Sequence, residues 1–109
     1  MSGTTGADAF TIEVRHQGAR VEVALHGELD AYSAPRLHEA ILGLGDLAGR
    51  HVVLDLAAVG FVDSAGLAAI VTSLRGAKDQ DAAVSVRGMT PQVHKLFEIT
   101  GLSRLFPHE

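Results

Sequence analysis

The sequence has 109 residues, a length that suits one compact domain around a single core. Its formal charge of −4 and isoelectric point near 5.8 offer no basic patch for phosphate backbones, so no nucleic acid is expected as a partner. Cysteine is absent, which excludes disulfides, thiolate zinc sites and thiol nucleophiles.

Residues 1–9 are mostly small and polar, and we expect them to form a flexible leader before an ordered domain over residues 10–109. They have neither the basic region nor the apolar region of a signal peptide. No stretch approaches the roughly 18 apolar residues that span a bilayer. We therefore expect a cytoplasmic protein without a membrane partner.

Residues 10–15 and 20–26 alternate apolar and polar side chains, which is the period of a half-buried strand. The apolar positions are Phe10, Ile12 and Val14, then Val21, Val23 and Leu25. The residues between the two stretches include a glycine at hairpin length. The sequence therefore predicts an antiparallel hairpin.

A first helix is predicted with Ser33 as its N-cap and Pro35 as its second residue, because proline is tolerated only in a first turn. Its apolar face consists of Leu37, Ile41 and Leu44. The stretch HVVLDLAAV (51–59) then has consecutive apolar residues and is too short for a lone helix. This pattern indicates a parallel strand covered on both faces.

A second helix is predicted from Ser64, ending at Gly76 or in the turn KDQD (78–81). Its apolar face consists of Leu67, Ile70, Val71 and Leu74. AAVSVRG (82–88) predicts another strand.

A third helix is predicted between Thr90 as N-cap, followed by Pro91, and Gly101. LSRLF (102–106) predicts a short edge strand. This order of elements predicts one α/β domain, with a mixed β-sheet that has an N-terminal antiparallel hairpin and parallel strands covered by helices.

GFVDSAG (60–66) lies where the predicted strand meets the second helix, the place where parallel sheets carry functional residues. Ser64 could act as an N-cap, as a nucleophile or as the target of a modification, and capping is the commonest of these roles. Gly66 in a first helical turn costs up to about 1 kcal/mol relative to alanine, which indicates that another segment approaches closely there. With Gly60 nearby, Asp63 and Ser64 are expected on an exposed corner.

A serine hydrolase is disfavoured, because Val62 stands where the nucleophile elbow has its first glycine and the chain is too short for that fold. The Walker phosphate-binding loop is also absent. None of the six histidines lies four residues from another, so no metal site is expected. We interpret Asp30 and Asp46 as turn residues, and Asp55 as an aspartate near a strand end that hydrogen-bonds a neighbouring turn. No catalytic residue and no cofactor are expected.

Three blocks resemble the STAS family of bacterial anti-sigma factor antagonists (sulfate transporter and anti-sigma antagonist domain). They are LHGELDAYSAPRL (25–37), VVLDLAAVGFVDSAGLAAIV (52–71) and TGLSRLF (100–106). Their order and intervals agree with the family, and the resemblance runs from about Phe10 to Phe106. It implies a STAS domain over residues 10–109.

The resemblance implies that Ser64, in the motif DSAG (63–66), is phosphorylated by an anti-sigma factor that is itself a serine kinase. The unmodified antagonist would bind this kinase and free the sigma factor, and a protein phosphatase would restore it. The implied partner-binding residues are Gly27, Glu28, Leu29, Asp30, Asp63, Ser64, Ala65 and Gly66.

STAS domains also serve as subunits of transport and stress complexes. A constitutive scaffold or adaptor is therefore the alternative, although an intact motif in a free-standing chain favours the antagonist. In both cases the protein is expected to be no enzyme. Leu29, Tyr32 and Val62 are candidates for an exposed apolar contact patch.

Overall fold

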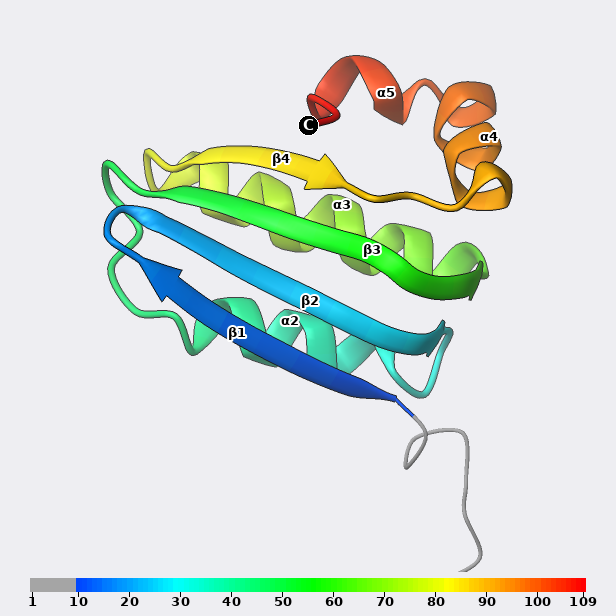
Figure 1. Ribbon diagram of the computed structural model, residues 1–109, viewed down its shortest axis with the longest axis horizontal. Coiled ribbons are helices and arrows are strands. Elements are labelled where there is room, and N and C mark those ends of the chain that lie inside the picture. Colours follow the sequence, from blue (N-terminus) through cyan, green and yellow to red (C-terminus); the bar gives the residue numbers. More distant parts are fainter. Residues whose placement is uncertain (1–9) are drawn as a thin grey trace, which may run out of the picture.

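The computed structural model describes residues 10–109, which form one four-stranded sheet with helices on one face and beyond one edge (Figure 1). Across the sheet the strands are β1 (Thr11–Gln17), β2 (Arg20–Leu29), β3 (His51–Val62) and β4 (Ala83–Arg87). β1 is antiparallel to β2, and β2, β3 and β4 are parallel. This arrangement confirms the predicted mixed sheet. The expected leader lies outside the described residues.

The hairpin between β1 and β2 has two loop residues, and Gly18 takes the first position with φ +61°. A glycine with positive φ at that position is typical of a type II′ turn, whose twist matches that of the flanking strands. The turn pairs Gln17 with Arg20, and the pairing continues to Thr11 opposite His26. The predicted hairpin is therefore confirmed.

Two helices, α2 (Ala34–Leu42) and α3 (Ser64–Asp79), cover one face of the sheet (Figure 1). Their buried side chains include Leu37 and Ile41 from α2 and Ile70 and Leu74 from α3. These residues pack with the inward-facing side chains of the strands in one core. No helix within residues 10–109 is long and apolar enough to cross a membrane.

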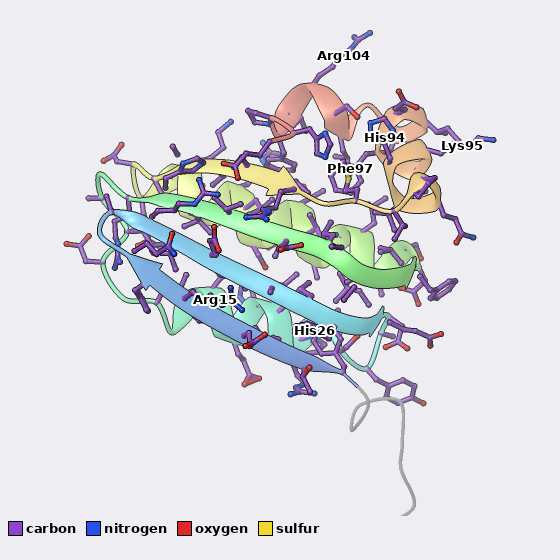
Figure 2. All side chains as sticks on the ribbon, in the orientation of Figure 1. Arg15, His26, His94, Lys95, Phe97 and Arg104 are labelled. Carbon is purple, nitrogen blue, oxygen red and sulfur yellow. The ribbon has the colours of Figure 1, made fainter. Side chains whose placement is uncertain are left out.

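Two further helices, α4 (Pro91–Thr100) and α5 (Leu102–Leu105), lie beyond β4. Figure 2 shows Phe97 pointing from α4 toward the sheet and Lys95 pointing away, and Phe97 is fully buried. The predicted caps of α4 are confirmed. The Thr90 hydroxyl accepts a hydrogen bond from the Val93 amide at 3.3 Å, and Gly101 ends the helix with φ +79°.

The edge strand predicted for LSRLF is wrong, because these residues form α5. The left-handed turn at Gly101 redirects the chain and buries Leu102, so the backbone reaches the edge of β4 only later. There the Val86 amide donates to the carbonyl of Pro107 at 2.9 Å, and the Glu109 amide donates to the carbonyl of Val86 at 2.7 Å.

The face of the sheet away from α2 and α3 is charged rather than covered by helices. Glu22 lies 2.9 Å from Arg20 and 3.2 Å from Arg87, and Arg87 lies 3.6 Å from Asp55. Val53 is nevertheless fully buried on this face. The expectation that β3 is buried on both faces is therefore met only near its start, at residues 52–54, and helices cover only one of the two faces.

Candidate functional site

The site predicted from the sequence lies where β3 ends and α3 begins. Asp63 has an extended backbone (φ −93°, ψ −174°), and its carboxylate accepts a hydrogen bond from the Gly66 amide at 2.8 Å. Asp63 is therefore the N-cap of α3, and Ser64 is the first residue inside the helix. The capping role considered for Ser64 is wrong, because its neighbour fills that role.

Ser64 is exposed, and its hydroxyl makes no hydrogen bond within residues 10–109. Three of the other four serines within residues 10–109 are buried instead. Ser33, Ser73 and Ser85 are between 1% and 5% exposed, and only Ser103, on α5, is also exposed. Ser64 thus presents a free hydroxyl to solvent at the exposed corner that the sequence predicted.

Gly66 allows the end of β2 to lie against the first turn of α3. A Cβ atom at this position would lie 2.2 Å from the carbonyl oxygen of Leu29, which is far inside contact distance. The same oxygen accepts a hydrogen bond from the Asp63 amide at 3.2 Å. The expected close approach to Gly66 is confirmed, and the approaching group is the backbone of Leu29.

Two shifts in the pairing of β2 with β3 bring these strand ends together. Ala24 pairs with Asp55, but His26 pairs with Ala58, and the register moves again between Gly27 and Glu28. Each shift adds one residue to β3, as a β-bulge does. The strands end with Leu29 opposite Val62, immediately before the start of α3.

The chain from Glu28 to Ser33 is held by its own polar groups. The Asp30 carboxylate accepts hydrogen bonds from the amides of Tyr32 and Ser33 at 3.0 and 3.1 Å. These hydrogen bonds hold the pKa of Asp30 below its ordinary value, and the bond from the Ser33 backbone has the largest effect. The turn role predicted for Asp30 is confirmed.

Ser33 lies immediately before α2 as predicted, but its side chain does not cap that helix. Its backbone is already helical (φ −89°, ψ −21°), whereas a capping residue is normally extended. The hydroxyl instead donates to the carbonyl of Glu28 at 2.7 Å and accepts from the Asp30 amide at 2.9 Å. Ser33 therefore closes the loop beside the site.

The structure brings the predicted partner-binding residues together, with two corrections, because Leu29 and Gly66 are both buried. Gly27, Glu28, Asp30, Ser64 and Ala65 are at least partly exposed around the junction. Leu29 is fully buried, so its side chain cannot belong to the exposed apolar patch proposed for it. Because β2 alternates its side chains, this position faces the core together with Val21, Val23 and Leu25.

Two exposed rings lie close to this junction in the chain. Tyr32, a candidate contact residue from the sequence, is 79% exposed, and Phe61, which was not among those candidates, is 47% exposed. A large apolar residue two positions before the DSAG motif was the available signal for Phe61. Val62 is only partly exposed.

Two shallow apolar grooves run along α3. The first, of about 360 Å³, begins at Ser64 and passes Leu67 and Val71 toward Leu102. The second, of about 350 Å³, lies between α2 and α3 and is lined by Pro35, Ala65, Ala68 and Thr72, among others. The outer face of α3 therefore continues the site away from Ser64.

Within residues 10–109, no three histidine, aspartate or glutamate side chains are grouped as metal ligands would be. Asp46 acts as predicted, but Asp55 lies inside β3 and bonds within that strand rather than to a turn. Asp46 accepts a hydrogen bond from the Ala48 amide at 3.1 Å, and Asp55 accepts one from the Ala57 amide at 2.9 Å.

Comparison with known proteins identifies relatives along nearly the whole chain. Residues 12–107 match the family model described as "Mlab, STAS domain". The anti-sigma-B factor antagonist of Staphylococcus aureus is 34% identical over 96 residues, which cover 88% of this chain and 89% of that protein. An anti-sigma factor antagonist from Mycobacterium paratuberculosis has a TM-score of 0.81 at 27% identity, covering 96% of this chain and 89% of that one. The phosphorylated form of Bacillus SpoIIAA shares the fold, with a TM-score of 0.69 at 20% identity over 93% of this chain and 91% of that one.

Proposed function

This chain belongs to the STAS domain family, and on that premise we propose that it is an anti-sigma factor antagonist switched off by phosphorylation of Ser64. Unmodified, it binds an anti-sigma factor that is a serine kinase, and this binding releases the sigma factor. The kinase transfers a phosphoryl group from ATP to the Ser64 oxygen, and a protein phosphatase removes it. The chain is thus a substrate and binding partner in the cytoplasm, and no enzyme itself.

The observation that carries this proposal is the division of roles between Asp63 and Ser64. Asp63 caps α3, so the Ser64 hydroxyl is exposed and is not needed for the fold. A kinase can therefore modify it without unfolding the domain. The relatives named as anti-sigma factor antagonists support the same function.

A phosphate on Ser64 suits the start of a helix. The first amides of α3 have no partner inside the helix, and the helix dipole favours negative charge there by about 0.3 to 2 kcal/mol. Asp63 already occupies the amide of Gly66, which leaves those of Ser64 and Ala65 nearest to the phosphate. We therefore expect the same fold in both forms, with nearly identical circular dichroism.

The same phosphate would oppose partner binding. It adds about −1.5 to −2 charges beside Asp63, and at roughly 6 Å their repulsion is on the order of 1 kcal/mol in water and 4 kcal/mol at a partly desolvated surface. A partner that covers this corner must also desolvate the new dianion. Even 3 kcal/mol corresponds to more than a hundredfold in affinity.

The contact surface proposed for the kinase surrounds Ser64. Tyr32 and Phe61 offer exposed rings, and aromatic side chains often dominate the energy of such interfaces. The grooves along α3 extend this surface from Ser64 and Ala65. Tyr32→Ala should therefore weaken kinase binding while leaving the free energy of unfolding nearly unchanged.

The test compares wild type, Ser64→Ala, Ser64→Asp and the control Ser103→Ala. The control removes the other serine that is exposed within residues 10–109. With the cognate kinase and ATP, intact mass should rise by one phosphate in wild type and Ser103→Ala but not in Ser64→Ala. Calorimetry should show tight kinase binding by Ser64→Ala and weak binding by Ser64→Asp. Equal affinities without phosphate incorporation would contradict the switch and favour the constitutive scaffold.

A further inference from the structure

The two edges of the sheet differ in whether other residues cover their backbone groups. At the β4 edge, residues 107–109 hydrogen-bond to Val86 and so occupy part of its free backbone. At the opposite edge, no described residue lies beyond β1 (Figure 1). Six of the seven residues of β1 are exposed. An exposed edge strand is a template for pairing with another chain.

The hairpin determines which backbone groups of β1 face outward. In a two-residue hairpin the residues flanking the loop bond to each other, and bonding alternates along the strand from there. Gln17 pairs with Arg20, so Ile12, Val14 and His16 direct their backbone N–H and C=O groups away from β2. These three residues form an unpaired row at the free edge.

The sequence of β1, TIEVRHQ, is complementary to itself in antiparallel orientation. If two copies pair around Val14, Glu13 of each copy lies opposite Arg15 of the other. Both side chains are exposed, Glu13 to 59% and Arg15 to 65%, and their contact within one strand is long, at 4.0 Å. Glu13 also lies 3.3 Å from Nε2 of His26 on β2, and this exposed contact leaves its second carboxylate oxygen for a partner. The same register places Ile12 opposite His16, and the backbone N–H and C=O groups of both residues point toward the partner copy.

Charge selects this register among its neighbours. Pairing centred on Glu13 places two glutamates directly opposite, and pairing centred on Arg15 places two arginines opposite, both of which are unfavourable. Only the register centred on Val14 pairs opposite charges. Val14 is itself 39% exposed, so the axis brings two partly exposed apolar side chains together.

We propose that β1 is a homodimer interface, in which two copies of this chain pair antiparallel around Val14 and join their sheets. The two-fold axis makes the contact isologous, because both copies use the same surface. It therefore closes after two copies and does not extend into a fibre. A single seven-residue strand gives a contact below the usual size of about 1,200 to 2,000 Å². The dimer is therefore reversible and depends on concentration.

Disulfide trapping tests the register, because the natural chain has no cysteine. Val14→Cys should form a disulfide-linked dimer under mild oxidation, since residue 14 faces its own copy at a separation that a disulfide can bridge. Gln17→Cys is the control on the same strand. In this register it lies opposite Thr11, so two copies of residue 17 are roughly 20 Å apart and should not cross-link.

A mixture of Thr11→Cys and Gln17→Cys proteins should cross-link, although neither should do so alone. Circular dichroism of each variant verifies that the fold is retained. If Val14→Cys cross-links no faster than Gln17→Cys, the proposed register is wrong.

Charge exchange gives an independent test by analytical ultracentrifugation of the full chain. Glu13→Arg and Arg15→Glu should each weaken self-association on the order of tenfold, because the two-fold axis repeats every like-charge contact. Mixing the two variants should restore association, and so should combining both substitutions in one chain. A wild-type chain that stays monomeric up to about 1 mM would overturn the proposal.

Discussion

The carbonyl oxygen of Leu29 lies 2.2 Å from the point where a Cβ atom of residue 66 would stand. The end of β2 and the first turn of α3 therefore fit together only because residue 66 is glycine. Since the same oxygen accepts the Asp63 amide, this contact fixes the start of the helix against the Glu28 to Ser33 loop. The direction in which Ser64 projects depends on it.

Gly66→Ala should destabilise the fold by about 1 to 3 kcal/mol, because the new methyl group collides with backbone that cannot move freely. Gly76→Ala is the matched control on the same helix. No atom lies within 4 Å of its added Cβ, and alanine favours a helix interior by about 0.5 to 1 kcal/mol, so this variant should be stabilised. Urea denaturation measures both, and effects of the same sign would contradict the packing argument.

Substitutions of Asp63 separate its capping role from its charge. Asp63→Ala should cost about 0.5 to 2 kcal/mol of folding stability, because the Gly66 amide loses its partner. Asp63→Asn keeps an oxygen for that amide and should be nearly as stable as wild type. Thermal unfolding checks the stabilities. With the kinase, Asp63→Asn should also lose less affinity than wild type when Ser64 is phosphorylated, because one negative charge is gone.

Ser33→Ala should cost about 1 to 3 kcal/mol, although the substitution is small. It leaves the Glu28 carbonyl and the Asp30 amide without the hydroxyl that joins them in a buried position. Ser103→Ala, at an exposed serine, should stay within about 0.5 kcal/mol of wild type. Guanidinium denaturation of both variants makes the comparison, and equal stability would show that the Ser33 hydroxyl is dispensable.

Asp30 should contribute to stability in a pH-dependent way. Its folded-state pKa is lowered, chiefly by the Ser33 backbone hydrogen bond, so the ionised carboxylate stabilises the fold above the ordinary value of 3.8. This contribution should be lost as the pH falls through the lower folded-state pKa. NMR titration of the carboxyl group should show a midpoint below 3.8. The stability difference between wild type and Asp30→Asn should shrink over the same acidic range.

Local sequence patterns correctly predicted the hairpin and α4, because residues close together in the chain determine these elements. Alternation and a glycine turn located the hairpin, and Thr90 with Gly101 located both ends of α4, because propensity and capping act within a few residues. The position of the DSAG motif at a strand-to-helix junction also followed from the chain alone. Its exposed serine was correctly placed on that basis.

The errors arose where distant parts of the chain decide the outcome. Leu29 is buried because β2 continues to residue 29, where α3 packs over its end, whereas the alternating pattern predicted a strand only over residues 20–26. The Ser33 hydroxyl prefers the Glu28 carbonyl because the loop folds back on itself. LSRLF has strand-like composition, but Gly101 and the burial of Leu102 make it helical.

In β3 the interval between inward-facing side chains lengthens along the strand. Positions 52, 54 and 56 face the core in steps of two, and after each shift in pairing the next inward positions are 59 and 62. The inward-facing side chains thus move from even to odd positions at the first shift, and return to even positions at the second shift, just before α3. Loss of one residue between positions 57 and 61 would leave a single phase change, and the segment leading to Ser64 would meet β2 with its inside and outside exchanged. A change in length along this stretch is therefore tolerable only when it leaves the segment before Ser64 in the same phase against β2.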